Sequence, residues 1–546
     1  MMPIKIRCGC GQKYAFDVEP VDGAMGYAVL CPVCGVDGTA LANELIAERL
    51  GAHSLSVPAL RLDRHAPVLA GDPPVPRTVP VLAAARKLSG AKVRNKKLLP
   101  VVCGGVVLVL IGAALVGRSV GLGQKPVNAA AAGNDGLPHT PAELNAWYVE
   151  PPDGQNAAKL FSEGIQVLNL ANVESSGVPL LGRGKLPPLG SPMPASVKSS
   201  LSALIRSNRE SLRFFAQATR YEQSRYPVDL SLGAEAAFPH LTKMIGACQL
   251  LELAAISHAE ANDAKSSADD LRSALALANS LRAEPYFFSQ IVRARLVGIA
   301  VAGLEQSANR ACWTTEGSAE LFNDFQKMEE NDARGDGFGR SVIGERVMAM
   351  SLLAKPEKFL ELLPVLAADI SPDRRARMAA RLQSGKLQAE ERFFDQALLK
   401  LLQVRRQPFP DRLKADDLIR QQTAEAESTQ LVLAEFLLSG LKIVAAKEAR
   451  CLACLRLGLT ATALDQFRAT HDHRYPATLS ELTPSPFATI PTDPYDGQPL
   501  RYKTKTDGYV LYSVGPDLKD NLGQRTNDKE GNIVFAVIIP PRERKD

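Results

Sequence analysis

The sequence predicts a multidomain, mainly α-helical protein that has a small β-rich N-terminal domain, one transmembrane helix, a large α-helical body and a C-terminal α+β module with an antiparallel sheet. Three features predict this organisation: four cysteines near the N-terminus, one long uncharged apolar stretch, and apolar residues at helical spacing that give way to strand-like segments. The predicted segments are 1–50 (β-rich domain), 51–97 (proline-rich linker with a basic end), 98–117 (transmembrane helix), 118–139 (linker), 140–460 (helical body) and 461–546 (α+β module).

The composition of the 546 residues is that of a globular protein, with 46% apolar and 23% charged residues, and it excludes disordered and collagen-like classes. The net charge of +5 comes from the first 97 residues, which hold 13 Lys and Arg against 8 Asp and Glu. The remaining residues hold 51 of each sign. Because a nucleic-acid-binding body normally carries a basic surplus, we expect no nucleic-acid partner.

Two pairs of cysteines lie within residues 1–50: Cys8 and Cys10 in the run RCGCG, and Cys31 and Cys34 in the run CPVCG. Tetrahedral zinc binds four such thiolates, and the glycines that follow free backbone N–H groups to hydrogen-bond the sulfurs. The pattern resembles a zinc ribbon, which implies a structural zinc ion bound by all four cysteines. The first pair has one intervening residue instead of two, and a redox dithiol is the alternative for the second pair.

Two short strands are predicted in this domain, at 12–18 and 27–30, with a turn at Asp22-Gly23 between them. A domain of about fifty residues has a small core, so zinc is expected to supply much of its folding free energy. Four thiolates leave the ion no open position for water, which favours a structural or adhesive role towards an unidentified cytoplasmic partner.

Residues 98–117 read LLPVVCGGVVLVLIGAALVG, a stretch of twenty residues without a charge. As a helix this stretch extends about 30 Å, which is the thickness of a bilayer's hydrocarbon core. We therefore predict a single transmembrane helix in place of a buried core helix. The 97 residues before it are too many for the n-region of a signal peptide, although cleavage within 128–133 remains an alternative.

The charges that flank this stretch predict its orientation. Six basic and no acidic residues lie between positions 86 and 97, whereas only Arg118 and Lys125 follow before Asp135. By the positive-inside rule the N-terminus is cytoplasmic and the C-terminal region extracytoplasmic, in the inner membrane. This placement keeps the four cysteines in a reducing compartment. Contact of the basic run with anionic lipid headgroups is favoured over nucleic-acid binding.

Linkers are predicted on both sides of the membrane helix. Residues 51–97 contain six prolines and are expected to form an extended tether, with an unrecognised small domain as the alternative. The second linker, 118–139, is rich in glycine and alanine.

Helical signals dominate from residue 140 to residue 460. The run Thr140-Pro141-Ala142-Glu143 has the order of a capping box with proline in the first turn. Apolar residues then recur at helical spacing in three stretches: Leu241, Met244, Ile245, Cys248, Leu251 and Ala255; Leu271, Ala274, Leu275, Ala278 and Leu281; and Phe288, Val292, Leu296 and Ile299. The short turns between them predict antiparallel neighbours. Around residues 240–300 the chain loosely resembles a tetratricopeptide-like hairpin, and without a regular repeat elsewhere an irregular bundle is expected.

No catalytic constellation is evident in this body. The glycine-rich run 334–339 follows no strand and lacks a Gly-Lys-Ser/Thr ending, so a loop is predicted in place of a phosphate cradle. The basic run 373–377 is interpreted as a solvated helix start. Cys451 and Cys454 lie in an apolar helical stretch and are interpreted as small core residues. A disulfide involving these cysteines, Cys248 or Cys312 is left open.

The C-terminal region carries an ordered series of motifs from Leu464 onward. They are a helix that closes on RYP (474–476), a short helical turn with Leu479 and Leu482, DPYDG (493–497), LRY (500–502) and GYVLYSVGPD (508–517). This order resembles the C-terminal half of the major pseudopilin of the type II secretion apparatus. The resemblance implies a long helix laid on a small antiparallel sheet, with strands at 500–503, 509–514 and 533–539.

The loop between the last two strands is the candidate metal site of this module. Pseudopilins similar to this chain place calcium there, which implies oxygen ligands from Asp517, Asp520, Asn527 and Asp528. An ordinary polar loop is the alternative, because three basic residues dilute its acidity. His471 and His473 are interpreted as structural, since no partner carboxylate or nucleophile is positioned by the sequence.

One departure from the pseudopilin pattern concerns the start of the protein. A pseudopilin begins with a short basic leader, a glycine cleavage site and an apolar polymerisation helix, whereas here the membrane helix lies far before the module and lacks that leader. Filament assembly by the pilin route is therefore not expected. The module is predicted to dock on the end of the helical body.

These features predict a single-pass membrane-anchored scaffold or interaction protein of the bacterial envelope, with a link to secretion implied by the pseudopilin resemblance. Its expected partners are the lipid bilayer, a cytoplasmic protein and an envelope protein, neither of them identified by the sequence. Two alternatives remain: an extracytoplasmic enzyme whose site is assembled from residues far apart in the sequence, and a transmembrane signalling protein. The sequence identifies no catalytic residue and no oligomeric state.

Overall fold

The computed structural model describes residues 2–7, 13–18, 29, 39, 42–43, 46, 136–171, 173–310, 315–368, 370–506, 508–525 and 531–538. The chain divides into two compact units, Met1–Arg94 and Asn95–Asp546. The predicted transmembrane stretch 98–117, the four cysteines of the predicted zinc ribbon and nearly all of both predicted linkers lie outside the described residues.

The N-terminal unit contains an antiparallel pair of strands, β1 (Met2–Arg7) and β2 (Lys13–Val18), in which Met2 lies opposite Val18 and Arg7 opposite Lys13. Strand β2 confirms the strand predicted at 12–18, whereas β1 was not predicted. Residues 8–12, which include Cys8 and Cys10, connect the two strands in the sequence and are not described.

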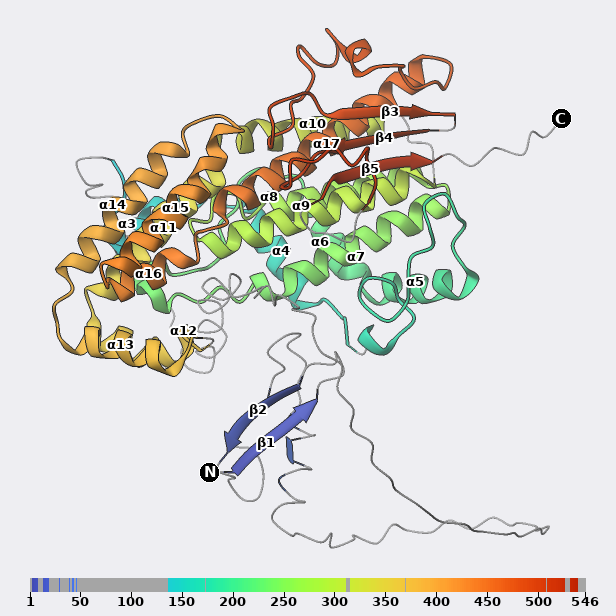
Figure 1. The fold of residues 1–546 in the computed structure, drawn as a ribbon. Coiled ribbons are helices and arrows are strands. Elements are labelled where there is room, and N and C mark those ends of the chain that lie inside the picture. The colour runs from blue at the N-terminus through green and yellow to red at the C-terminus, as the bar shows by residue number, and fades with distance from the viewer. Residues whose placement is uncertain are drawn as a thin grey trace, which may run out of the picture. The chain divides into compact units, whose positions relative to one another are not determined.

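The C-terminal unit is mainly helical. Its described residues form fifteen α-helices, four short 3-10 helices and one three-stranded antiparallel sheet (Figure 1), which confirms the predicted mainly helical class with a small C-terminal sheet. The helices are α3 (Pro141–Trp147), α4 (Ala157–Gln166), α5 (Ala195–Ser207), α6 (Arg209–Ala218), α7 (Leu241–Glu260), α8 (Ala264–Asn279), α9 (Phe287–Ala308), α10 (Thr315–Arg334), α11 (Asp336–Leu353), α12 (Pro356–Leu366), α13 (Pro372–Gln383), α14 (Gln388–Val404), α15 (Lys414–Ser428), α16 (Val432–Ser439) and α17 (Val444–Thr470). The 3-10 helices are η1 (Val173–Ser175), η2 (Leu230–Glu235), η3 (Asp411–Leu413) and η4 (Leu479–Leu482).

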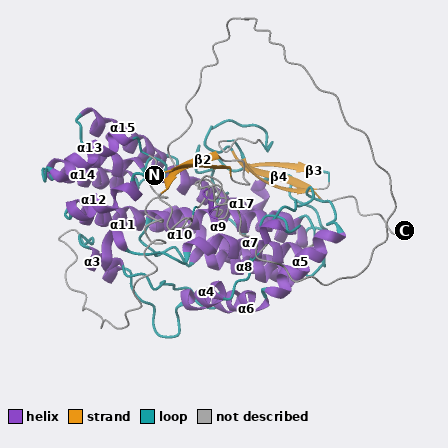
Figure 2. Cartoon of the chain, turned by 90° about the horizontal axis from the view of Figure 1, so that it is seen from below, coloured by secondary structure: helices purple, strands orange, loops and turns teal. Residues whose placement is uncertain are grey.

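These helices form two groups within the unit. Helices α3 and α11–α16 lie together at one end, and α4–α10 lie at the other end with the sheet (Figures 1 and 2). One buried apolar cluster joins α7–α10, α17 and the sheet, and a second joins α11 and α14–α16 to the first turns of α9 and α17. The long helices α9 and α17 therefore belong to both cores.

Local sequence signals place several of these helices as predicted. At the start of α3, the Glu143 N–H donates to Thr140 Oγ1 at 3.2 Å and the Thr140 N–H donates to Glu143 Oε2 at 3.3 Å, which forms the predicted capping box. Helices α7, α8 and α9 correspond to the three predicted apolar stripes. Helix α8 begins at Ala264 and is capped by Asp263, whose side chain accepts the Ser266 N–H.

Helix α9 is long and apolar enough to cross a membrane by length and composition, and it is the one such helix among the described residues. However, 67% of its apolar window is buried inside the structure. It also carries the fully buried Arg293, which pairs with Asp332 of α10 at 2.8 Å. These contacts are those of a core helix, because lipid offers no partner for a guanidinium.

The sheet has the order β3 (Arg501–Lys505), β4 (Gly508–Ser513) and β5 (Ile533–Ile538). These strands confirm the three predicted at 500–503, 509–514 and 533–539. Strand β4 is buried along its whole length, and the sheet packs on α9 and α17 within the same apolar cluster as the body. The domain boundary predicted at residue 461 falls within α17.

Side chains of α9 close the outer edge of β5. Asn309 donates to the Ala536 carbonyl at 2.8 Å and accepts the Ile538 N–H at 2.6 Å, while Glu305 accepts the Ala536 N–H at 2.6 Å. An open strand edge invites pairing with another chain, so these contacts protect the edge and lock the sheet to the body.

The DPYDG motif forms a buried link between the chain that leads into β3 and the end of β4. Asp493 is fully buried, and its carboxylate accepts the Tyr495 N–H at 3.1 Å, the Ser513 hydroxyl at 2.9 Å and the Val514 N–H at 2.8 Å. The Arg501 guanidinium lies 3.3 Å from the same carboxylate. The first residue of this motif therefore has a structural role here.

The prediction of a loop at 334–339 is wrong, because only Gly335 separates α10 from α11 and the residues after it begin α11. Gly335 has a φ of +79°, and a Cβ there would lie 2.9 Å from the Arg412 guanidinium. Glycine is thus needed both for the left-handed backbone and for the close approach of Arg412.

Replacing Gly344 of α11 by alanine is expected to lower the free energy of unfolding by about 1–3 kcal/mol, although alanine is the better helix former. An added Cβ would lie 1.7 Å from the Pro285 carbonyl oxygen, so α11 must move away from the start of α9. Gly339 of the same helix is the control, because nothing lies within 4 Å of its added Cβ. Chemical denaturation should show Gly339→Ala neutral or stabilising; equal effects of the two changes would contradict this packing.

Candidate functional site

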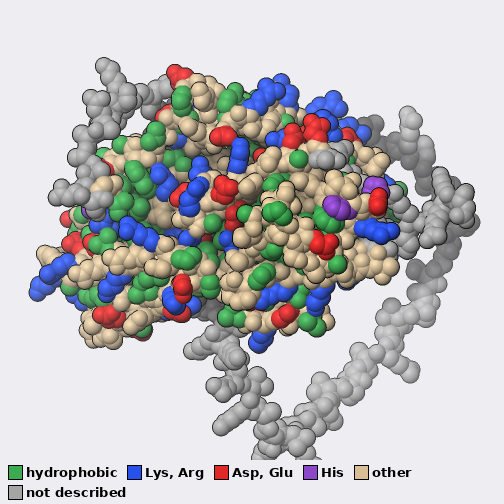
Figure 3. Space-filling view, turned by 90° about the horizontal axis from the view of Figure 1, so that it is seen from above, with side chains coloured by type: hydrophobic (Ala, Val, Ile, Leu, Met, Phe, Trp, Pro, Cys, Tyr) green, Lys and Arg blue, Asp and Glu red, His purple; other side chains and the backbone are tan. Residues whose placement is uncertain are grey.

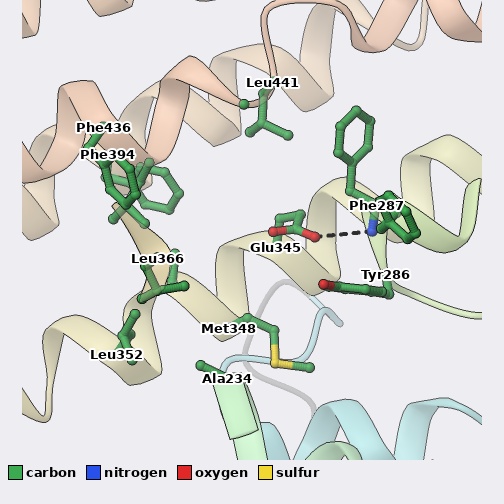
Figure 4. A pocket seen from close by; sticks show the side chains of 14 residues that line it. Ala234, Tyr286, Phe287, Glu345, Met348, Leu352, Leu366, Phe394, Phe436 and Leu441 are labelled. Carbon is green, nitrogen blue, oxygen red and sulfur yellow. Dashed lines mark hydrogen bonds between the residues drawn. The ribbon is translucent and has the colours of Figure 1, made fainter. Parts of the chain in front are cut away.

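A pocket of about 60 Å³ lies where the start of α9 meets α11, α14 and α16 (Figure 4). Most of its lining side chains are apolar, and three of the aromatic ones are Phe287, Phe394 and Phe436. In the described part of the chain, the polar side chains that line it are the Glu345 carboxyl and the Tyr286 hydroxyl, and no lining residue is cationic. A largely apolar lining with a few well-placed polar groups is that of a small-molecule binding site, and the volume of this pocket admits only a very small ligand.

Close packing of α11 on the start of α9 positions Glu345. Gly344 lets the α11 backbone approach Pro285, and on the next residue the Glu345 carboxylate accepts the Phe287 N–H at 3.1 Å. The first N–H groups of a helix lack intrahelical partners, so Glu345 satisfies one of them for α9. Burial raises the pKa of Glu345 to about 7, and the hydrogen bond from Phe287 opposes this shift only in part.

Replacing Glu345 by glutamine is expected to stabilise the protein progressively, relative to the parent, as the pH rises from about 5 to 8. The carboxyl has an ordinary pKa of 4.5 when unfolded but about 7 when folded, so between these values the folded state binds the extra proton. The parent's free energy of unfolding therefore falls, by at most about 1.4 kcal/mol per pH unit from this group. Glutamine does not titrate and still offers an oxygen to Phe287. Denaturation curves across this pH range test this, and a constant difference between the two proteins would contradict it.

A second polar cluster is buried between α9, α10, α14 and α17. Glu448 accepts from Arg405 at 2.7 Å and from Arg412 at 2.8 Å, and all three side chains are at most 3% exposed. Nearby, Asp332 pairs with Arg293 and accepts from the Cys451 thiol at 3.3 Å. These groups bond to one another and line none of the four pockets described here, so they serve to hold the helices together.

A third cluster contains residue types that are common in catalysis. Glu284 accepts hydrogen bonds from Ser289 and from Tyr148 (3.3 Å), and His240 Nε2 lies 3.2 Å from the same carboxylate. Ser289 and Glu284 are fully buried and His240 is 8% exposed, and none of the three lines a described pocket. The Glu284 carboxylate sits between serine and histidine, so the histidine does not contact the hydroxyl, and the base that does contact it is buried away from the described pockets. This arrangement suits a core anchor better than a nucleophile.

Two larger grooves lie on the surface. One, of about 500 Å³, runs between α8 and α10 and the segments next to α4 and α6; the other, of about 620 Å³, lies between α13 and the turn from α15 to α16. Their charges largely neutralise one another, as in the pairs Arg272–Asp324 (2.7 Å) and Arg374–Glu435. On the face shown in Figure 3, positive and negative side chains are likewise interspersed.

The structure describes two of the four predicted calcium ligands, Asp517 and Asp520. Asp517 accepts the Lys519 N–H at 3.1 Å, and Asp520 accepts from the Tyr512 hydroxyl at 2.9 Å and from the Leu522 N–H at 2.8 Å. Each carboxylate thus organises its own turn of the loop. The other two predicted ligands, Asn527 and Asp528, lie outside the described residues. Calcium binding by this loop stays a prediction.

The remaining candidate residues have structural surroundings. Cys451, Cys454 and Cys248 are buried free thiols, so the interpretation of Cys451 and Cys454 as core residues is confirmed. His471 is exposed and stacks on Phe467, with ring centroids 3.7 Å apart. The predicted zinc ligands Cys8, Cys10, Cys31 and Cys34 are not described, as stated above. In the described part of the chain, no three His, Cys, Asp or Glu side chains form a group that could hold a metal ion.

Sequence reasoning missed Glu345, Glu448 and Glu284. A signal for such residues exists, because Glu345 and Glu448 each lie within a helical stretch that is rich in apolar residues. A charged residue on a buried face requires a partner or a shifted pKa. The partners come from distant segments, however, and only the fold brings them together.

A comparison of the chain with protein-family models, with curated proteins and with solved structures finds no match.

Proposed function

We propose that this protein is a single-pass membrane-anchored interaction protein of the bacterial envelope. Residues 98–117 span the inner membrane, the N-terminal domain lies in the cytoplasm, and the helical unit with its sheet lies outside. The observation that carries this proposal is the uncharged stretch of twenty residues, which follows six basic residues and precedes only two before the next acid.

Binding is favoured over catalysis by the surroundings of the polar residues. Within the described residues, the buried clusters around Glu284 and Glu448 consist of groups bonded to one another, and the larger grooves are lined by paired charges. A hydrolytic site would require a nucleophile with a base beside it; the Glu345 carboxyl faces the apolar pocket, but among the described residues no serine, threonine, cysteine, lysine or histidine lines that pocket with it. The extracytoplasmic unit is therefore proposed to act as a scaffold.

The two ends of the chain supply the proposed contacts. The zinc ribbon, with zinc bound by Cys8, Cys10, Cys31 and Cys34, meets a cytoplasmic partner. The C-terminal helix and sheet, which resemble a pseudopilin, meet an envelope component of a secretion apparatus. The continuous core between the sheet, α9 and α17 supports a rigid module that presents its outer surface without moving against the body.

Introducing two arginines into the predicted span, as Val106→Arg with Leu110→Arg, is expected to release the protein from the membrane. Each arginine near the bilayer centre costs about 2.5–3.5 kcal/mol on insertion scales, and the two together outweigh much of the apolar gain of the stretch. Flotation and carbonate extraction of the full chain measure the effect. The matched change Val106→Ile with Leu110→Ile should leave the protein in the membrane fraction. Release of the parent chain by carbonate alone would contradict the proposal.

A further inference from the structure

The pocket at Glu345 combines a half-buried acidic group with space beside it. Among the described residues, the Phe287 N–H is the one donor that reaches the carboxylate, although a carboxylate accepts several hydrogen bonds. Figure 4 shows Glu345 between Phe287, Tyr286 and Leu441, with Phe394 and Phe436 across the pocket. The Glu345 carboxylate can therefore accept further hydrogen bonds from a group placed in the apolar pocket.

The charges around the pocket favour a cationic occupant. Among the residues that the structure describes, no arginine, lysine or histidine lines it, and the other titratable lining group is the Tyr286 hydroxyl. Burial without a nearby cation raises the pKa of Glu345, and an ammonium group in the pocket would reverse that shift. Aromatic rings also attract cations through their π-faces, whereas an anion would be repelled by the ionised carboxylate.

The size of the pocket limits the rest of the ligand. Because roughly 10–15 Å³ of such a volume holds one water-sized group, 60 Å³ holds about four to six non-hydrogen atoms. Apolar side chains such as Leu352, Leu366 and Leu441 surround this space, so the atoms beyond the ammonium should be aliphatic.

We propose that this pocket binds a small aliphatic primary amine, with the ammonium group on the Glu345 carboxylate and the alkyl group among the surrounding apolar side chains. The ligand is a free short-chain alkylammonium ion. This site lies in the helical body and does not depend on membrane anchoring or on the zinc ribbon.

Calorimetric titration of the full-length protein in detergent at about pH 8 tests the proposal, because there the carboxyl is mostly ionised and the amine is protonated. The probes are isobutylamine, isobutanol and isobutyrate, which share a carbon skeleton and differ in charge. Isobutylamine should bind at least about tenfold more tightly than isobutanol, and isobutyrate should bind more weakly than either. Equal affinities of the amine and the alcohol would overturn the proposal.

Two variants test the location of the amine. Glu345→Gln should weaken isobutylamine binding about tenfold and change isobutanol binding little, because it removes the charge and keeps the shape. Ala349→Leu should abolish the binding of both probes by filling the space beside Met348 and Phe394. Unchanged amine binding by either folded variant would mean that the amine pairs with carboxylates elsewhere, and would overturn the proposal. If a variant does not fold, the probe series on the parent decides the question alone.

Discussion

Replacing Glu448 by alanine is expected to lower the free energy of unfolding by about 3–5 kcal/mol. The change leaves the Arg412 and Arg405 guanidiniums buried without their carboxylate, and both are 3% exposed. Arg405 loses the one hydrogen-bond acceptor that it has among the described residues, since its Nε and Nη1 already have none. Uncompensated charge in a core costs more than the pair itself contributes. Chemical denaturation followed by circular dichroism measures the loss.

Glu427, which is exposed on α15, provides the matched control for this change. Glu427→Ala should shift the unfolding free energy by less than about 0.5 kcal/mol, because surface substitutions away from special features have small effects. A loss of under 1 kcal/mol for Glu448→Ala would mean that water reaches the two arginines, and the account of this buried cluster would then be wrong.

Replacing Asp493 by alanine is expected to cost about 3–4 kcal/mol and to loosen the sheet first. The buried Asp493 carboxylate accepts hydrogen bonds from the Tyr495 N–H, the Ser513 hydroxyl and the Val514 N–H. It also contacts the Arg501 guanidinium. Alanine leaves these donors unpaired in the core. Hydrogen exchange measured by mass spectrometry should therefore show lost protection in β3 and β4 before any loss in α7 and α8.

Asp517→Ala serves as the comparison for the sheet. Among the described residues, the Asp517 carboxylate accepts one hydrogen bond, from the Lys519 N–H, so its loss should cost less than about 1 kcal/mol. Comparable exchange behaviour in the two variants would show that Asp493 does not link the DPYDG turn to β4.

Local and repetitive signals predicted the class of the fold and some of its elements. The capping box at Thr140, the helices α7–α9 and the strands β3–β5 follow from residue spacing and turn residues, which act over a few positions. The helix start after Gly335 was missed because three glycines suggest a loop. The close contact with Arg412 requires glycine at position 335, and the packing of α11 on Pro285 requires glycine at position 344. These tertiary contacts override the low helix propensity of glycine.

The sites were less predictable than the fold. The pocket at Glu345 requires α11 to pack on the start of α9, and the ion pairs of Glu448 join residues 36 and 43 positions away. No local pattern in one sequence specifies such pairings. Conversely, the cysteine pairs and the uncharged stretch are strong sequence signals that lie outside the described residues, and they remain predictions to be tested biochemically.

The central claim is that residues 98–117 separate a cytoplasmic N-terminal domain from an extracytoplasmic helical unit. Proteinase K added to intact spheroplasts tests it, with antibodies against each part of the full chain. The account predicts cleavage in the linker at 118–139, release of the helical unit, and a membrane-bound N-terminal fragment that is degraded only after lysis. Retention of the helical unit inside intact spheroplasts, or recovery of the whole chain in the supernatant after lysis, would contradict it.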